Sequence, residues 1–176
     1  MITRDNLDDM MGVYSILSHI PIDNNQIKGK LYLGGRNALN QVKEYNIDHL
    51  ISMIDAPTVH GIKHEKFPIN DYNTDECRMQ LAGMLNTISS SIHKSLLEGK
   101  NVCVHCLAGV SRSPAVVADY LMTYHQTPNP LKYIKSHRHV IRPNPGFIRL
   151  LYERNMMLMT MDWKLKEVWK ESMFPF

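Results

Sequence analysis

The most informative run of the chain is VHCLAGVSRS, residues 104–113. Within it, Cys106 and Arg112 stand six positions apart. Residues 101–105 have the apolar pattern of a strand, and residues 114–125 have the apolar spacing of a helix. A loop between a strand and a helix N-terminus directs several backbone N–H groups at one anion. The run therefore predicts a loop that binds a phosphate group.

The side chains of this loop suit the hydrolysis of a phosphoester. Such a reaction without a metal needs a nucleophile, a clamp for the phosphoryl oxygens and an acid for the leaving group. Cys106 is the candidate nucleophile, because a thiol at a helix N-terminus beside cationic groups has a pKa of roughly 3.5–7.5. Arg112 is the candidate clamp, since its planar fork can hold two phosphoryl oxygens at once. The loop amides expected to bind the phosphoryl oxygens belong to Leu107, Ala108, Gly109, Val110, Ser111 and Arg112.

Three residues of the run are expected to support this chemistry. Gly109 allows a backbone turn that a Cβ would hinder. The hydroxyl of Ser113 is within plausible reach of the sulfur, where it would stabilise the departing thiolate; an ordinary serine at a helix N-terminus is the alternative. His105 is expected to orient the loop by hydrogen bonding, which is a structural role.

At these residues the chain resembles the protein tyrosine phosphatase superfamily, whose signature is His-Cys, five residues, Arg, and then Ser or Thr. The run from His105 to Ser113 is most similar to the small dual-specificity phosphatases. Further segments resemble the family's opening strand, its general-acid segment and the element after its later helix: LYLGG at 31–35 with Ala38, FPIND at 67–71 and RPNPGF at 142–147. The resemblance covers the chain from Lys28 to Leu158.

The resemblance implies roles for two residues outside the loop. Asp71 would protonate the leaving oxygen and then activate the water that hydrolyses a phosphocysteine, as one acid–base group in a suitable position can do. Asn144 would brace the phosphate-binding loop through its side-chain amide, with a simple turn residue as the alternative. Asp75 is the rival acid, and Asp55, shortly before Pro57, has the pattern of a turn residue.

The order of elements predicts an α/β fold with a central, mostly parallel sheet flanked by helices, and with the phosphate-binding loop between a strand and a helix. Strands are expected at 30–33, 49–54, 64–69 and 101–105, and helices at 3–20, 76–97, 113–125, 130–137 and 146–159. The predicted organisation is an N-terminal helical extension at 1–27, a dual-specificity phosphatase catalytic domain at 28–158 and a C-terminal helical tail at 159–176. The terminal helices are a possible homodimer contact.

Two other groups of residues allow a functional reading. Cys103 could form a disulfide with Cys106 under oxidation, although packing in the core is the favoured interpretation. The basic stretch at 132–142 could hold a second anion, although a solvated helix face is favoured there; its members are Lys132, Lys135, His137, Arg138, His139 and Arg142.

Composition narrows the class of protein. The 176 residues are 44% hydrophobic and 21% charged, as is usual for a globular domain, and no run is apolar enough to cross a membrane. The net charge of +3 mildly favours anionic substrates but is too small to indicate a nucleic-acid partner, and none is expected. The chain's three cysteines show no metal-ligand spacing and suggest a reducing, cytoplasmic or nuclear compartment.

These observations predict a dual-specificity protein phosphatase that acts on phosphotyrosine and on phosphoserine or phosphothreonine through a phosphocysteine intermediate. The expected partner is a phosphoprotein substrate, and neither a metal nor an organic cofactor is expected. Two alternatives stay open. The same chemistry could act on a phosphoinositide or an RNA 5′-phosphate, although the loop interior carries no Lys. The chain could also be a phosphoprotein-binding module.

Overall fold

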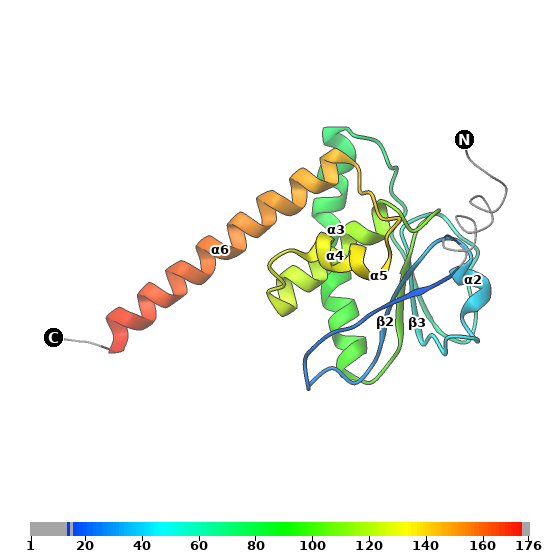
Figure 1. Ribbon diagram of the computed structural model, residues 1–176, viewed down its shortest axis with the longest axis horizontal. Coiled ribbons are helices and arrows are strands. Elements are labelled where there is room, and N and C mark those ends of the chain that lie inside the picture. The colour runs from blue at the N-terminus through cyan, green and yellow to red at the C-terminus, as the bar shows by residue number, and fades with distance from the viewer. Residues whose placement is uncertain (1–13, 15, 174–176) are drawn as a thin grey trace.

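The computed structural model describes residues 14 and 16–173, with side chains described up to residue 160. It contains a five-stranded sheet with the order β1-β2-β5-β3-β4 (Figure 1). The first pair is antiparallel, and the other three pairs are parallel, which confirms the predicted mostly parallel sheet. The strands are β1 (Ser18–Ile20), β2 (Leu31–Gly34), β3 (His49–Ser52), β4 (Lys63–Lys66) and β5 (Val102–His105).

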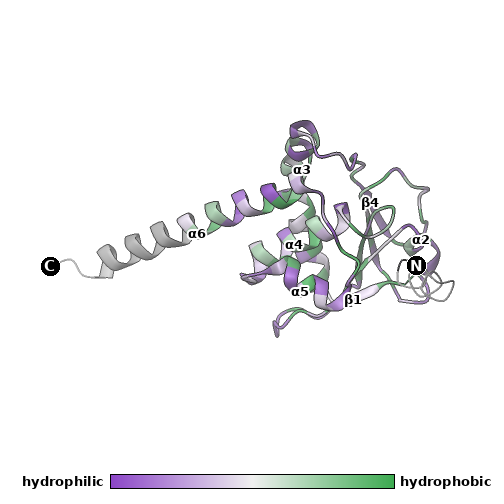
Figure 2. Ribbon diagram, turned by 45° about the horizontal axis from the view of Figure 1, so that its top comes forward, coloured by the Kyte–Doolittle hydropathy of each residue, from purple (hydrophilic) through white to green (hydrophobic). Residues whose placement is uncertain are grey.

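Helices cover both faces of the sheet. The helices α3, α4, α5 and α6 lie on one side of the sheet, and the short α2 lies on the other; α6 continues well beyond the body of the molecule (Figure 1). The buried apolar residues of the helices on the larger side form one hydrophobic cluster with residues of the sheet. Figure 2 colours each residue by hydropathy and shows hydrophobic and hydrophilic positions interspersed along α3 and α4. The helices are α2 (Ala38–Gln41), α3 (Asp75–Leu97), α4 (Arg112–His125), α5 (Pro130–His137) and α6 (Pro145–Met173).

The central strand β5 is buried along its whole length, because it has a strand neighbour on each side and a helical layer on each face. Val102 and Val104 belong to the larger hydrophobic cluster, which includes residues of α3, α4 and α6. Cys103 belongs to the smaller cluster on the side of α2. Since successive strand residues point to opposite faces, Cys103 packs away from Cys106, which is in the larger cluster. The structure thus agrees with core packing for Cys103.

The long helix α3 begins where the sequence provides a cap. The Thr74 side chain accepts a hydrogen bond from the backbone N–H of Cys77, and two acidic residues follow in the first turn, where the helix dipole favours them. Its buried residues recur at helical spacing and pack on the sheet. The chain leaves the helix at Gly99, whose positive φ of 81° suits glycine.

The structure departs from the sequence-based elements at both ends of the chain. The helix predicted for 3–20 is wrong at its end, because Ser18–Ile20 forms the antiparallel strand β1. The apolar side chains of Leu17 and Ile20 fit a helical spacing, yet they pack in the two different clusters. Residues 1–13 and 15 lie outside the described residues.

The last helix is longer than the predicted 146–159 and runs without a break to Met173. The predicted pairing of two copies through the terminal helices falls mostly on residues 1–13 and on side chains beyond residue 160, which lie outside the described ones. Between the ends, no other boundary shifts by more than three residues, α5 has the predicted bounds, and the four-residue helix α2 is an addition to the predicted elements.

Candidate active site

The predicted phosphate-binding loop joins the end of β5 to the start of α4, at the carboxyl end of the parallel strands. Gly109 has a φ of 68°, and a Cβ there would lie 2.6 Å from the backbone carbon of Gly34. Both the conformation and the close approach therefore require glycine.

Five consecutive carbonyl groups of the loop are hydrogen-bonded from outside it. The carbonyls of residues 107 and 110 accept from the backbone N–H groups of Arg36 and Arg142, at 2.9 and 2.7 Å. Those of residues 108 and 109 accept from the guanidinium of Arg138, at 3.2 and 2.9 Å. The carbonyl of Cys106 accepts from His105 Nδ1, at 3.2 Å. In a trans peptide the N–H points opposite to the C=O, so the loop amides are left facing inward.

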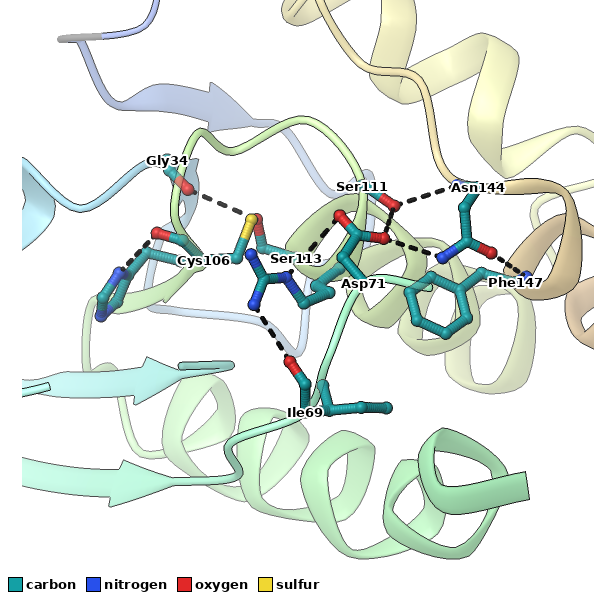
Figure 3. A network of polar contacts seen from close by, with 10 residues as sticks. Gly34, Ile69, Asp71, Cys106, Ser111, Ser113, Asn144 and Phe147 are labelled. Atoms are coloured by element: carbon teal, nitrogen blue, oxygen red, sulfur yellow. Dashed lines mark hydrogen bonds and ion pairs between the residues drawn. The ribbon is translucent and has the colours of Figure 1, made fainter. Parts of the chain in front are cut away.

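The thiol of Cys106 lies at the bottom of this loop. Its Sγ accepts a hydrogen bond from Ser113 Oγ at 3.2 Å, which brings these two predicted residues together (Figure 3). Burial raises the pKa of Cys106, but the hydrogen bonds from the Ser113 side chain and backbone, the charge of Arg112 and the Gly109 amide outweigh it. The net result is a pKa below the usual value for a thiol. The thiolate is thus favoured relative to an ordinary cysteine.

The guanidinium of Arg112 makes one hydrogen bond within the described residues, and its Nε also faces the Asp71 carboxylate in a longer ion pair. Its Nη1 donates to the carbonyl of Ile69 at 3.0 Å. Its Nε is buried and has no hydrogen-bond partner among the described residues. A buried unpaired N–H is costly, so the side chain is poised to accept an anionic partner.

A cavity of about 410 Å³ opens over the loop. It brings together the predicted nucleophile, clamp and acid, Cys106, Arg112 and Asp71, although Asp71 is distant in sequence. The residues that line it are Tyr14, Asp71, Cys106, Leu107, Ala108, Val110, Ser111 and Arg112. Tyr14 is a lining residue that the sequence analysis missed, because no motif marks it.

The carboxylate of Asp71 is tied to the loop by hydrogen bonds. Its Oδ1 accepts from Ser111 Oγ at 2.7 Å and from Asn144 Nδ2 at 2.8 Å (Figure 3). Its Oδ2 lies 3.7 Å from Arg112 Nε. Both hydrogen bonds therefore fall on Oδ1, and Oδ2 faces the Arg112 guanidinium.

Asn144 braces the site in a different way from the predicted one. Its backbone N–H, not its side-chain amide, contacts the loop, donating to Ser111 Oγ at 3.0 Å. The amide instead positions Asp71. Its Oδ1 accepts from the backbone N–H of Phe147 at 3.0 Å and so caps the start of α6.

The rival acid Asp75 and the predicted turn residue Asp55 lie elsewhere. Asp75 is in the first turn of α3 and forms an ion pair with Arg78. Asp55 follows β3 and lines a separate cavity together with Ile69 and Arg112. Neither lines the cavity that holds Cys106.

The basic stretch at 132–142 divides into buried and exposed members. Arg138 is 1% exposed, and its contacts with the loop carbonyls and with Ile16 and Ser18 give it a structural role, not that of a second anion site.

The sequence analysis also missed Ser52 and His64, which extend the contacts of His105. Among the described residues, no group of three or more potential metal ligands lies together, and no helix is long and apolar enough to span a membrane.

Comparison with known proteins places these features in a family. Residues 31–157 match the family model described as "Dual specificity phosphatase, catalytic domain". The chain is 32% identical to human dual specificity protein phosphatase 22 over 158 residues, which cover 84% of this chain and 83% of that protein.

Two crystal structures share the fold. That of DUSP15 superposes with a TM-score of 0.65 at 32% identity, covering 75% of this chain and 86% of that one. That of human DUSP28 has a TM-score of 0.67 at 24% identity, covering 81% and 95% of the two chains. Both agree with the predicted α/β architecture.

Proposed function

The chain belongs to the dual-specificity phosphatase family, and on that premise we propose that it hydrolyses phosphotyrosine and phosphoserine or phosphothreonine in proteins through a phosphocysteine intermediate. The observation that carries the proposal is the cavity shared by Cys106, Arg112 and Asp71. It supplies the nucleophile, the oxyanion clamp and the acid that the reaction needs.

In the first step the Cys106 thiolate attacks phosphorus. An S–P bond forms as the P–O bond to the leaving group breaks, and Asp71 gives its proton to the leaving oxygen. The inward-facing loop amides and Arg112 bind the three phosphoryl oxygens while the S–P bond forms and the P–O bond breaks.

In the second step the intermediate is hydrolysed. Asp71, now a carboxylate, takes a proton from water as the water oxygen attacks phosphorus, and the S–P bond breaks. Inorganic phosphate leaves, and the Cys106 thiolate returns to its hydrogen bond with Ser113. The site residues proposed to carry the reaction are Cys106, Asp71 and Arg112 with the amides of Leu107–Arg112, supported by His105, Ser113 and Asn144.

The test is phosphate release in the presence of EDTA from phosphotyrosine and phosphothreonine peptides, a phosphoinositide and an RNA with a 5′-triphosphate. We expect release from the peptides alone, and none from the Cys106→Ser variant, which still binds phosphopeptide because the loop and Arg112 remain. Turnover of only the lipid or the RNA would support the proposed chemistry but contradict a phosphoprotein substrate.

A second variant tests the acid. Asp71→Asn should slow the hydrolysis of aryl phosphates most strongly where the leaving group has a high pKa, because such leaving groups need the proton.

Tight phosphopeptide binding with no turnover of any substrate by the wild type would instead favour the binding-module alternative. A reducing intracellular compartment is part of the same proposal, since a thiolate nucleophile is readily oxidised.

A further inference from the structure

A line of hydrogen bonds runs from the surface loop before β4 to the nucleophile. It joins the backbone N–H of Val59 to His64 Nδ1 (3.0 Å), His64 Nε2 to Ser52 Oγ (2.8 Å), Ser52 Oγ to His105 Nε2 (2.5 Å) and His105 Nδ1 to the Cys106 carbonyl (3.2 Å). Ser52 and His105 are fully buried, and His64 is partly buried. Two adjacent strands, β3 and β5, and the edge strand β4 contribute to it.

The first bond determines which atom donates and which accepts in every hydrogen bond of the line. A backbone N–H can only donate, so His64 Nδ1 must be the unprotonated ring nitrogen. A neutral imidazole then carries its hydrogen on Nε2, which donates to Ser52 Oγ. The single hydroxyl hydrogen of Ser52 is left for His105 Nε2.

The last bond requires the same direction independently. A carbonyl oxygen can only accept, so His105 Nδ1 must carry a hydrogen to donate to Cys106. A neutral His105 then has an unprotonated Nε2, which accepts from Ser52. Burial lowers the pKa of His105 to about 4, against the opposing effect of the hydrogen bond to the Cys106 carbonyl, so this ring is neutral near pH 7.

We propose that Ser52 and His64 are positioning residues that select the Nδ1-protonated tautomer of His105 and, through it, hold the Cys106 peptide at the start of the phosphate-binding loop. The Cys106 carbonyl is the first of the five that are bound from outside the loop. Without the Nδ1–H donor, this peptide loses the contact that keeps its amide side turned inward.

A matched pair of substitutions at one position tests the direction of the line. In His64→Gln the side-chain amide can still donate to Ser52 Oγ, so the direction is kept. Glutamate has the same shape as glutamine, but in His64→Glu the carboxylate can only accept. Ser52 therefore donates to it and presents a lone pair to His105 Nε2. This variant should convert His105 to the Nε2-protonated tautomer.

The tautomers can be read from the ring ¹⁵N chemical shifts of protein labelled at histidine, because protonated and unprotonated ring nitrogens resonate far apart. The signals of His105 are assigned from their loss in His105→Asn. We expect Nδ1-protonated His105 in the wild type and in His64→Gln, and Nε2-protonated His105 in His64→Glu. An Nε2-protonated His105 in the wild type, or an unchanged tautomer in His64→Glu, would overturn the proposal.

The kinetic part of the inference rests on the proposed function. Loss of one neutral hydrogen bond predicts that kcat falls roughly threefold to tenfold in His64→Glu, while KM stays near that of the wild type. The exposed His60→Glu adds the same charge nearby outside the line and should leave kcat unchanged. A converted tautomer with an unchanged kcat would refute the positioning role. A protein without phosphatase activity would still show the tautomers, so the two failures are distinguishable.

Discussion

The side-chain amide of Asn144, at the start of α6, donates to Oδ1 of Asp71 across 2.8 Å. These two residues lie 73 positions apart in the chain. The acid is therefore positioned by the element that follows α5, as well as by the loop that carries the nucleophile.

The isosteric substitution Asn144→Asp should separate this role from helix capping. A carboxylate still accepts from the Phe147 N–H, so stability to urea should change little. It cannot donate to Asp71 and places a like charge beside it, so kcat should fall roughly tenfold or more, as expected for loss of a hydrogen bond to a charged group. The matched control is Asn129→Asp, which makes the same change at the cap of α5 and should leave kcat unaltered. Equal kcat values for the two variants would contradict the positioning of Asp71.

Arg112→Lys keeps the charge but loses the planar fork. Lysine cannot hold two phosphoryl oxygens in that geometry, so kcat/KM should fall by about 10²–10³. Initial rates on a phosphotyrosine peptide measure the effect, and the exposed Arg149→Lys serves as the control. Near-normal rates in Arg112→Lys would mean that charge alone is sufficient.

Ser113→Ala removes the hydrogen bond that Cys106 Sγ accepts. This bond lowers the pKa of the thiol, so its loss raises the pKa and shrinks the thiolate fraction at pH values below it. The rate of alkylation by iodoacetate should rise with pH along a curve displaced to higher pH than in the wild type. A curve displaced to lower pH, or unmoved, would show that Ser113 does not stabilise the thiolate.

Two glycine-to-alanine changes should have opposite effects on the free energy of unfolding. Gly109→Ala places a Cβ at 2.6 Å from the Gly34 backbone at a positive φ, and should destabilise the fold by about 2–4 kcal/mol. Gly83→Ala, in the interior of α3 with open space around it, should stabilise the fold by about 0.5–1 kcal/mol. Urea unfolding of both variants measures the difference.

The buried carboxylate of Asp119 connects α4 to α6. Arg154 Nε lies 2.5 Å from its Oδ1, and Ser89 donates to its Oδ2. Arg154→Leu should cost about 3 kcal/mol of stability, because it leaves a buried charge without its partner. Arg149→Leu breaks an exposed ion pair on the same helix and should cost less than about 1 kcal/mol. Similar losses in the two variants would mean that Asp119 is stabilised without Arg154.

The parts of the fold that were predicted correctly depend on local patterns. Strand β5 and helix α5 follow from a short apolar run and from a capped amphipathic segment, and both lie within a residue of their predicted bounds. Strand β1 was missed, because only its pairing with β2 distinguishes it from the end of a helix. Helix α2 has no side-chain cap and four residues, too few for a periodic signal.

The site shows the same division. Cys106, Arg112 and Ser113 lie in one motif, and their spacing alone predicts their meeting. The partners Ser111 and Asp71 are 40 positions apart, and nothing local in either segment indicates the bond between them. Arg138 stands in a stretch of basic residues that suggests a solvated face, and its burial depends on carbonyl groups supplied by the distant loop.

The buried guanidinium of Arg138 also has a thermodynamic consequence. It contacts the carbonyls of residues 108 and 109 in the loop and, at the same time, the Ile16 carbonyl and the Ser18 hydroxyl beside β1. Anion affinity at the loop and the conformation of the segment that enters β1 are therefore linked functions. By reciprocity, any molecule that binds this segment and changes the loop's affinity for phosphate has its own affinity changed by phosphate by the same factor.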